Sequence, residues 1–153
     1  MRGGGRGGGG VTGGSWGAYW YNGYIYSNEI DRGFDIYELT PSEFLSANEI
    51  AAAKLVRFER YNPQSQPKIV WPAAFPVVRS YLDQLGRNNG LPAARRTAIT
   101  QTLRTAEGQS GAARRTTLTA LATALDGDAA AATDAKRVRA MAQAVRDLAN
   151  ATR

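Results

Sequence analysis

The chain contains no cysteine and no histidine. Without cysteine it has no disulfide, no thiolate nucleophile and no cysteine-based metal site. Without histidine it lacks the usual general base near neutral pH and the commonest metal ligand. No apolar run reaches the roughly eighteen residues of a membrane-spanning helix, and residues 1–14 lack the apolar segment of a signal peptide. We therefore expect a non-enzymatic chain with no catalytic residue, cofactor, metal centre or membrane span.

Charge is unevenly distributed along the 153 residues, whose formal net charge is +6. Residues 11–74 carry five basic and seven acidic side chains, whereas residues 75–153 carry twelve and six. Arginine outnumbers lysine sixteen to three beside abundant alanine, a bias that G+C-rich coding produces without selection for nucleic-acid binding. The basic balance alone therefore does not indicate a nucleic-acid partner.

Residues 1–14 are mostly glycine, with Arg2 and Arg6 among them. A segment this poor in side chains buries nothing, so it is predicted to be a disordered Gly/Arg-rich tail. It is either a linker or a short RNA-binding tail, and the absence of aromatic residues between the arginines favours the linker.

Aromatic and β-branched residues begin abruptly at Trp16 and predict a β-meander over residues 15–40. Asn22-Gly23 separates Ala18–Tyr21 from Tyr24–Ser27, which is the strongest short-range signal for a hairpin. A second turn at residues 31–33 leads into residues 34–39, where acidic residues are interspersed among apolar and aromatic ones, as in a half-buried strand. Three antiparallel strands are expected.

Residues 41–74 are predicted to form short helices followed by a proline-rich strap. The patterns Thr40-Pro41-Ser42-Glu43 and Ser46-Ala47-Asn48-Glu49 both have the residues of a capping box. They indicate a short helix or turn near 41–46 and a fuller helix near 47–56. Four of the six prolines lie within residues 61–76, which predicts an extended segment that Ile69, Val70 and Trp71 could fix to an apolar surface.

Residues 75–153 are helical in period and predict an antiparallel bundle of about four helices. The expected core stripes, one per helix, are Val78, Tyr81, Leu82 and Leu85; Ile99, Leu103 and Ala106; Leu118, Leu121 and Leu125; and Val138, Met141, Val145 and Leu148. The two middle segments resemble each other and open on Arg95-Arg96 and Arg114-Arg115. The predicted fold class is therefore α+β, an N-terminal three-stranded meander followed by a helical bundle.

Several motifs match a functional pattern without its structural context. Gly13-Gly14-Ser15-Trp16-Gly17 has the spacing of a nucleophile elbow, but no histidine exists to activate the serine. The acidic residues Glu29, Asp31, Asp35 and Glu38 offer oxygen ligands for Ca²⁺, but strand alternation places Asp35 and Glu38 on opposite faces. We interpret them as a solvated strand face.

Two residue sets remain as candidate sites. The aromatic residues of the meander are more often cross-strand pairs and core than a ligand platform, so core is the favoured interpretation. If the sheet is uncovered, the candidate interaction surface is Trp16, Tyr19, Trp20 and Tyr24. The candidate polyanion-binding residues are Arg95, Arg96, Arg114 and Arg115, which lie near helix starts where the macrodipole disfavours positive charge.

Residues 14–26 and 34–39, together with the following Leu39–Ser46 and Pro67–Pro72 segments, resemble the last repeat and tail of LVIVD-repeat proteins. This resemblance implies a β-propeller blade from an exported bacterial or archaeal protein, located outside the cell or at its surface. It supplies no catalytic residues. Because a propeller needs several blades and this chain has one, we expect a C-terminal fragment whose upstream blades are missing.

The expected function is that of a non-enzymatic interaction module that binds a protein or cell-envelope partner. The alternative is nucleic-acid or polyanion binding through the Gly/Arg tail and the helical arginines. Salt-dependent retention on heparin or RNA would distinguish the alternative from the first expectation.

Overall fold

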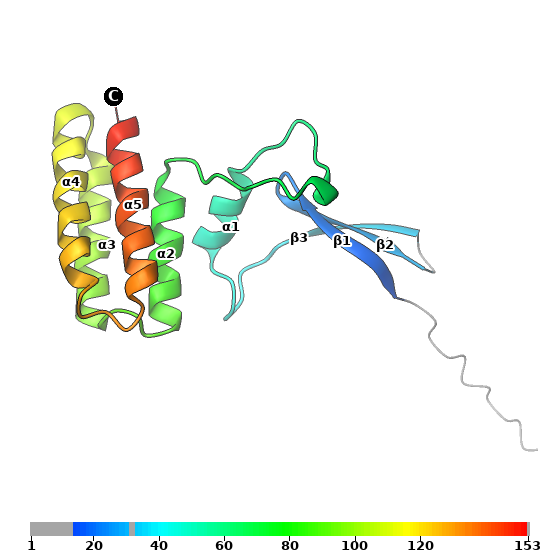
Figure 1. The fold of residues 1–153 in the computed structure, drawn as a ribbon, viewed down its shortest axis with the longest axis horizontal. Coiled ribbons are helices and arrows are strands. Elements are labelled where there is room, and N and C mark those ends of the chain that lie inside the picture. Colours follow the sequence, from blue (N-terminus) through cyan, green and yellow to red (C-terminus); the bar gives the residue numbers. More distant parts are fainter. Residues whose placement is uncertain (1–13, 31–32, 153) are drawn as a thin grey trace, which may run out of the picture.

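The computed structural model describes residues 14–30 and 33–152, and its fold is α+β (Figure 1). A three-stranded sheet lies at one end of an elongated molecule and a four-helix bundle at the other. One further helix and two loops lie between them. The predicted fold class is confirmed, with five helices in the described residues rather than about four. Except for Gly14, the predicted tail falls outside the described residues.

The sheet consists of β1 (Ser15–Tyr21), β2 (Tyr24–Glu29) and β3 (Gly33–Glu38), paired antiparallel in chain order. Asn22 and Gly23 have φ angles of 51° and 102°, so both central residues of the first turn take the positive φ that the predicted hairpin requires. β1 begins at Ser15, where the predicted meander begins, and has a bulge between Ser15 and Gly17. The predicted meander is present.

The two candidate capping boxes behave differently. Residues 42–45 form a turn closed by two backbone hydrogen bonds between Ser42 and Leu45. Ser46 then takes the extended conformation of an N-cap, which leaves no room for a helix before it. The second box is complete, because Ser46 and Glu49 each accept a backbone N–H of the other. It starts α1 (Ala47–Lys54), close to the predicted bounds.

Residues 62–74 run over the surface back to the bundle, with one short 3₁₀ turn, η1 (Pro63–Ser65). The apolar residues expected to fix this strap to a surface are only partly covered. Val70 is 77% exposed, and Ile69 and Trp71 remain about half exposed beside α2 and α5. Pro67 and Pro72 have no backbone N–H to donate, and no described strand pairs with this segment.

The bundle consists of α2 (Phe75–Arg87), α3 (Ala93–Gly108), α4 (Gly111–Asp128) and α5 (Ala135–Ala151). Each helix runs opposite to the one before it, and α5 lies between α4 and α2 (Figure 1). α1 packs against α2 on the side that faces the sheet. The predicted antiparallel arrangement is confirmed.

The hydrophobic core is built from the helical part of the chain alone. Every predicted stripe residue belongs to it, with Tyr81 partly buried at its margin. Its largest fully buried side chains are Leu85, Ile99, Leu103, Leu118, Leu125, Met141, Val78, Val138 and Val145. No apolar side chain of the described strands is buried. All three tryptophans, Trp16, Trp20 and Trp71, lie in the sheet or the strap.

Candidate functional site

The strand register divides the aromatic side chains of the meander between two faces. Tyr19 pairs with Tyr26, which pairs with Ile36, so these three residues share one face. Trp20 pairs with Ile25, which pairs with Tyr37, and these three share the other. We call the first of these the aromatic face; its members are Tyr19, Tyr21, Tyr24, Tyr26, Phe34 and Ile36.

The aromatic face is ordered by ring contacts but largely open to solvent. The rings of Tyr26 and Phe34 stack with centroids 6.0 Å apart, and Tyr21 lies 6.2 Å from Tyr26. Phe34 is nonetheless 59% exposed, and Tyr19 is 50% exposed. The prediction of cross-strand pairs is confirmed, whereas the prediction that these aromatics form a core is wrong. The helices do not fold back over the sheet (Figure 1).

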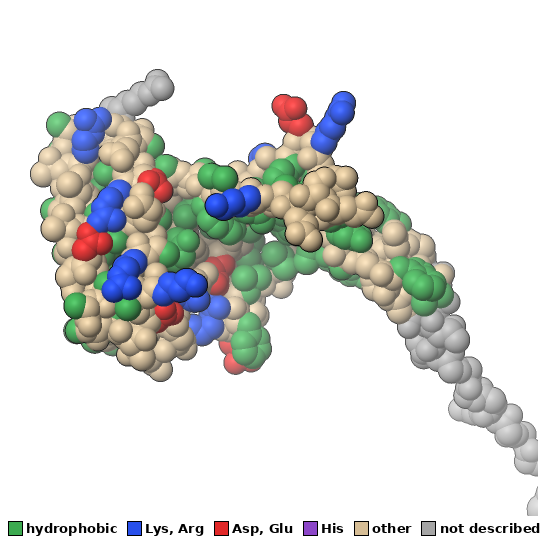
Figure 2. Space-filling view, in the orientation of Figure 1, with side chains coloured by type: hydrophobic (Ala, Val, Ile, Leu, Met, Phe, Trp, Pro, Cys, Tyr) green, Lys and Arg blue, Asp and Glu red, His purple; other side chains and the backbone are tan. Residues whose placement is uncertain are grey.

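The four residues of the predicted interaction surface are not brought together on one face. Tyr19 and Tyr24 belong to the aromatic face, and Trp20 lies on the opposite one, half-buried. Trp16, beside the bulge at the start of β1, is 79% exposed. Figure 2 shows hydrophobic side chains along the sheet end of the molecule and most of its charged side chains over the bundle.

A reciprocal amide contact holds the tip of the hairpin against the chain that follows α1. The Asn22 side chain donates to the Phe58 carbonyl at 3.0 Å and accepts the Phe58 N–H at 2.8 Å. The Tyr21 hydroxyl donates to the same carbonyl, and Lys54 pairs with Glu38. The hydrogen bond to Glu38 raises the pKa of Lys54. The sheet is therefore fastened at its tip and open along its length.

Residues 59–64 extend this contact and form a hollow of about 830 Å³ with the aromatic face. Tyr61 lies 6.1 Å from the Tyr21 ring and 5.3 Å from Phe58, so the aromatic cluster continues beyond the sheet. Sequence reasoning missed this segment. Pro63 and the prolines after it mark it only as irregular chain, and its contact with β1 joins residues about forty positions apart.

The four candidate arginines lie at both ends of the bundle rather than on one face. Arg95 and Arg96 are in the first turn of α3, and Arg114 and Arg115 are in the first turn of α4. Because α3 and α4 are antiparallel, these starts are about 24 Å apart for a sixteen-residue helix.

Three of these arginines bind the C-terminal end of a neighbouring helix. Arg114 donates to the carbonyls of Ala106 and Glu107 in the last turn of α3, and Arg115 donates to the carbonyl of Thr152 after α5. Arg95 pairs with Asp128 at the end of α4. Antiparallel packing thus places each cation beside carbonyls or a carboxylate at a negative helix end, which accounts for positive charge at helix starts.

We expect Arg114→Ala and Arg115→Ala each to lower the free energy of unfolding by about 1 kcal/mol, because each leaves helix-terminal carbonyls without a donor. Urea unfolding measured by circular dichroism checks this. Arg139→Ala, which removes an exposed arginine of α5, is the matched control and changes stability by less than about 0.5 kcal/mol. Loss of heparin binding in either variant at unchanged stability would contradict this structural role.

The described acidic residues do not assemble a metal site, since no group of three potential ligands occurs among residues 14–30 and 33–152. Asp35 pairs in register with Ser27 and Glu38 with Tyr24, so the two carboxylates lie on opposite faces as predicted. Asp31 falls outside the described residues. In the same part of the chain, no helix has both the length and the apolar character needed to cross a membrane.

Comparison of the chain with known protein families, with curated proteins and with solved structures finds no match.

Proposed function

We propose that this chain is a non-enzymatic binding module that docks through the aromatic face of its meander onto β-sheet of a protein partner. The observation that carries the proposal is the contrast between the two ends of the molecule. The bundle buries its own apolar side chains, whereas the sheet leaves Tyr19, Phe34 and Ile36 at least half exposed. Exposed apolar patches of this kind mark interaction sites in soluble proteins.

The edges of the sheet support the same proposal. β1 and β3 are both edge strands, and no other described strand pairs with either of them. Unpaired strand edges are templates for pairing with further chain. The resemblance of the meander to the last repeat of LVIVD-repeat proteins favours propeller blades as the partner, carried by a longer protein of which this chain is the C-terminal part. A cell-envelope protein with an exposed β-sheet could bind the same aromatic face.

The nucleotide sequence before the Met1 codon provides the first test. We expect it to continue the reading frame and to encode further aromatic meanders. A promoter and start codon with nothing blade-like upstream would contradict the propeller assignment.

The second test mixes the chain with those encoded blades, expressed as a separate protein, and replaces Phe34 of the chain with lysine. Burying a phenylalanine contributes about 2 kcal/mol, so Phe34→Lys is expected to weaken association of separately expressed blades and chain at least about tenfold by calorimetry. Val70→Lys is the matched control, because Val70 is 77% exposed on the strap and lies off the sheet. Equal losses in the two variants, or none, would contradict docking through the aromatic face.

A further inference from the structure

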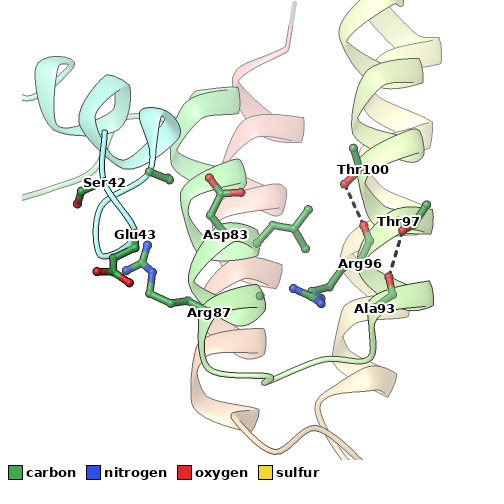
Figure 3. Close-up of a pocket in the computed structure, with 11 residues that line it drawn as sticks. Ser42, Glu43, Asp83, Arg87, Ala93, Arg96, Thr97 and Thr100 are labelled. Carbon is green, nitrogen blue, oxygen red and sulfur yellow. Dashed lines mark hydrogen bonds between the residues drawn. The ribbon is translucent and has the colours of Figure 1, made fainter. Parts of the chain in front are cut away.

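A polar pocket of about 540 Å³ lies between α2, α3 and the turn before α1, away from the sheet. Its lining combines guanidinium, carboxylate and hydroxyl groups (Figure 3). The side chains that matter to its chemistry are Glu43, Asp83, Arg87, Arg96, Thr97 and Thr100. No residue of the aromatic face lines this pocket.

Arg96 is the group in this pocket that lacks a partner. Its Nε is buried and makes no hydrogen bond to any described residue. Arg87, by contrast, pairs with Glu49, and the neighbouring Arg95 pairs with Asp128. The Nε is covered by the chain's own atoms, so an acceptor from outside the chain can bind only the terminal nitrogens of this guanidinium, which make no hydrogen bond or ion pair with a described residue.

Gly86 makes room for the guanidinium. Figure 3 shows the Arg96 side chain extending from α3 toward α2. A Cβ added at Gly86 would overlap the terminal nitrogen Nη1 of Arg96. Glycine is unfavourable within a helix, but at position 86 it leaves the space that the Arg96 guanidinium occupies.

The start of α3 adds partial positive charge to the same pocket. Pro92 is the N-cap of α3, and no side chain caps the first-turn N–H groups. Ala93, the first residue of the helix, lines the pocket. The helix dipole and the free N–H groups favour an anion here, in addition to the charge of Arg96.

The carboxylates in the pocket limit the charge that this anion can carry. Glu43 makes no hydrogen bond or ion pair with another described residue, and Asp83 accepts a hydrogen bond from Asn48. Two negative groups disfavour a doubly charged phosphate more than a singly charged carboxylate. A carboxylate also matches the planar donor pattern of a guanidinium.

We propose that this pocket binds a small carboxylate anion, with the Arg96 guanidinium as its main contact. The site is independent of the proposed docking face, so either can fail without the other.

The test follows the arginine Nε–Hε signals of the ¹⁵N-labelled chain by NMR, with the Arg96 signal assigned from Arg96→Lys. Sodium acetate is the probe. We expect a saturable shift of the Arg96 signal with a Kd on the order of 10–100 mM, as for one hydrogen-bonded pair of charged groups. Sodium chloride at equal ionic strength produces no saturation, and phosphate binds more weakly than acetate. Absence of a saturable acetate shift, or tighter binding of phosphate, would overturn the proposal.

Two variants separate binding from folding. Gly86→Ala is expected to displace Arg96 and abolish the acetate response, while the thermal unfolding midpoint is unchanged or raised because alanine favours helix. Arg104→Gln, which removes an exposed arginine of the same helix, retains the response. A response of the Arg96 signal that survives Gly86→Ala, or a saturable acetate shift of another arginine signal that survives Arg96→Lys, would sink the assignment to this pocket.

Discussion

Leu125→Ala is expected to lower the free energy of unfolding by about 3 kcal/mol, within the range measured for buried leucines. Leu125 is fully buried in the bundle core, where α4 packs against α5. Removing its side chain forfeits the transfer free energy of three carbons and leaves a cavity that thin, alanine-rich helices can only partly close. Urea unfolding followed by helical circular dichroism measures the loss.

Leu55→Ala is the matched control, because it makes the same chemical change at a side chain that is 42% exposed beside α1. We expect a loss below about 1 kcal/mol there. Equal losses at the two positions would contradict a core confined to the helices.

Glu49→Ala is expected to cost about 2 kcal/mol at neutral pH, because one carboxylate serves two helices. Glu49 accepts the Ser46 N–H that opens α1, and it also accepts hydrogen bonds from Gln84 and Arg87 on α2. Its side chain is only 11% exposed. The substitution therefore removes a cap and a link between helices at once.

The same residue makes this loss depend on pH. Burial acts to raise the pKa of Glu49, but the hydrogen bond from Ser46 and the contacts with Arg87 and Gln84 outweigh burial and lower it. A carboxyl with a lowered folded pKa stabilises fully above its unfolded pKa, whose ordinary value is 4.5. The difference between wild type and Glu49→Ala should therefore shrink as pH falls below 4.5.

Glu43→Ala is the control for this pH dependence. Glu43 is exposed and has no hydrogen-bonding or ionic partner among the described residues, so its removal changes stability little across the same pH range. A stability difference for Glu49→Ala that stays constant down to strongly acidic pH would contradict the charged role of Glu49.

Local sequence signals predicted the elements of this fold well, because the interactions that they describe are local. The positive φ angles of Asn22 and Gly23 and the reciprocal bonds of Ser46 with Glu49 each involve neighbours within three residues. The helical stripes also follow from period alone. The turn at residues 42–45 is one of the two forms predicted there, and the sequence alone did not decide between that turn and a short helix.

Exposure of the aromatic face could not be predicted in the same way. Alternation assigns Tyr19 and Trp20 to opposite faces, but it does not state whether anything covers either face. Whether a face is covered depends on the direction in which α1 and the strap leave the sheet. Contacts between residues that are distant in the sequence determine that direction. The Asn22 contact with Phe58 joins two such distant segments and fastens the sheet at its tip alone.

The arginine pairs show how packing changes the meaning of a pattern. In an isolated helix, Arg114 and Arg115 would lie near the N-terminus, where the helix dipole disfavours positive charge. Antiparallel neighbours reverse this conclusion, because the ends of α3 and α5 lie beside them. The space that Gly86 leaves for Arg96 likewise exists only once α2 and α3 are packed together.

The location of the three tryptophans gives the two ends of the molecule separate optical signals. Trp16 and Trp20 lie in the sheet and Trp71 in the strap, so tryptophan emission originates entirely outside the bundle. Far-ultraviolet ellipticity comes mainly from α2 to α5. Emission thus follows changes in the sheet and the strap, and ellipticity follows the bundle, in one sample without an added label.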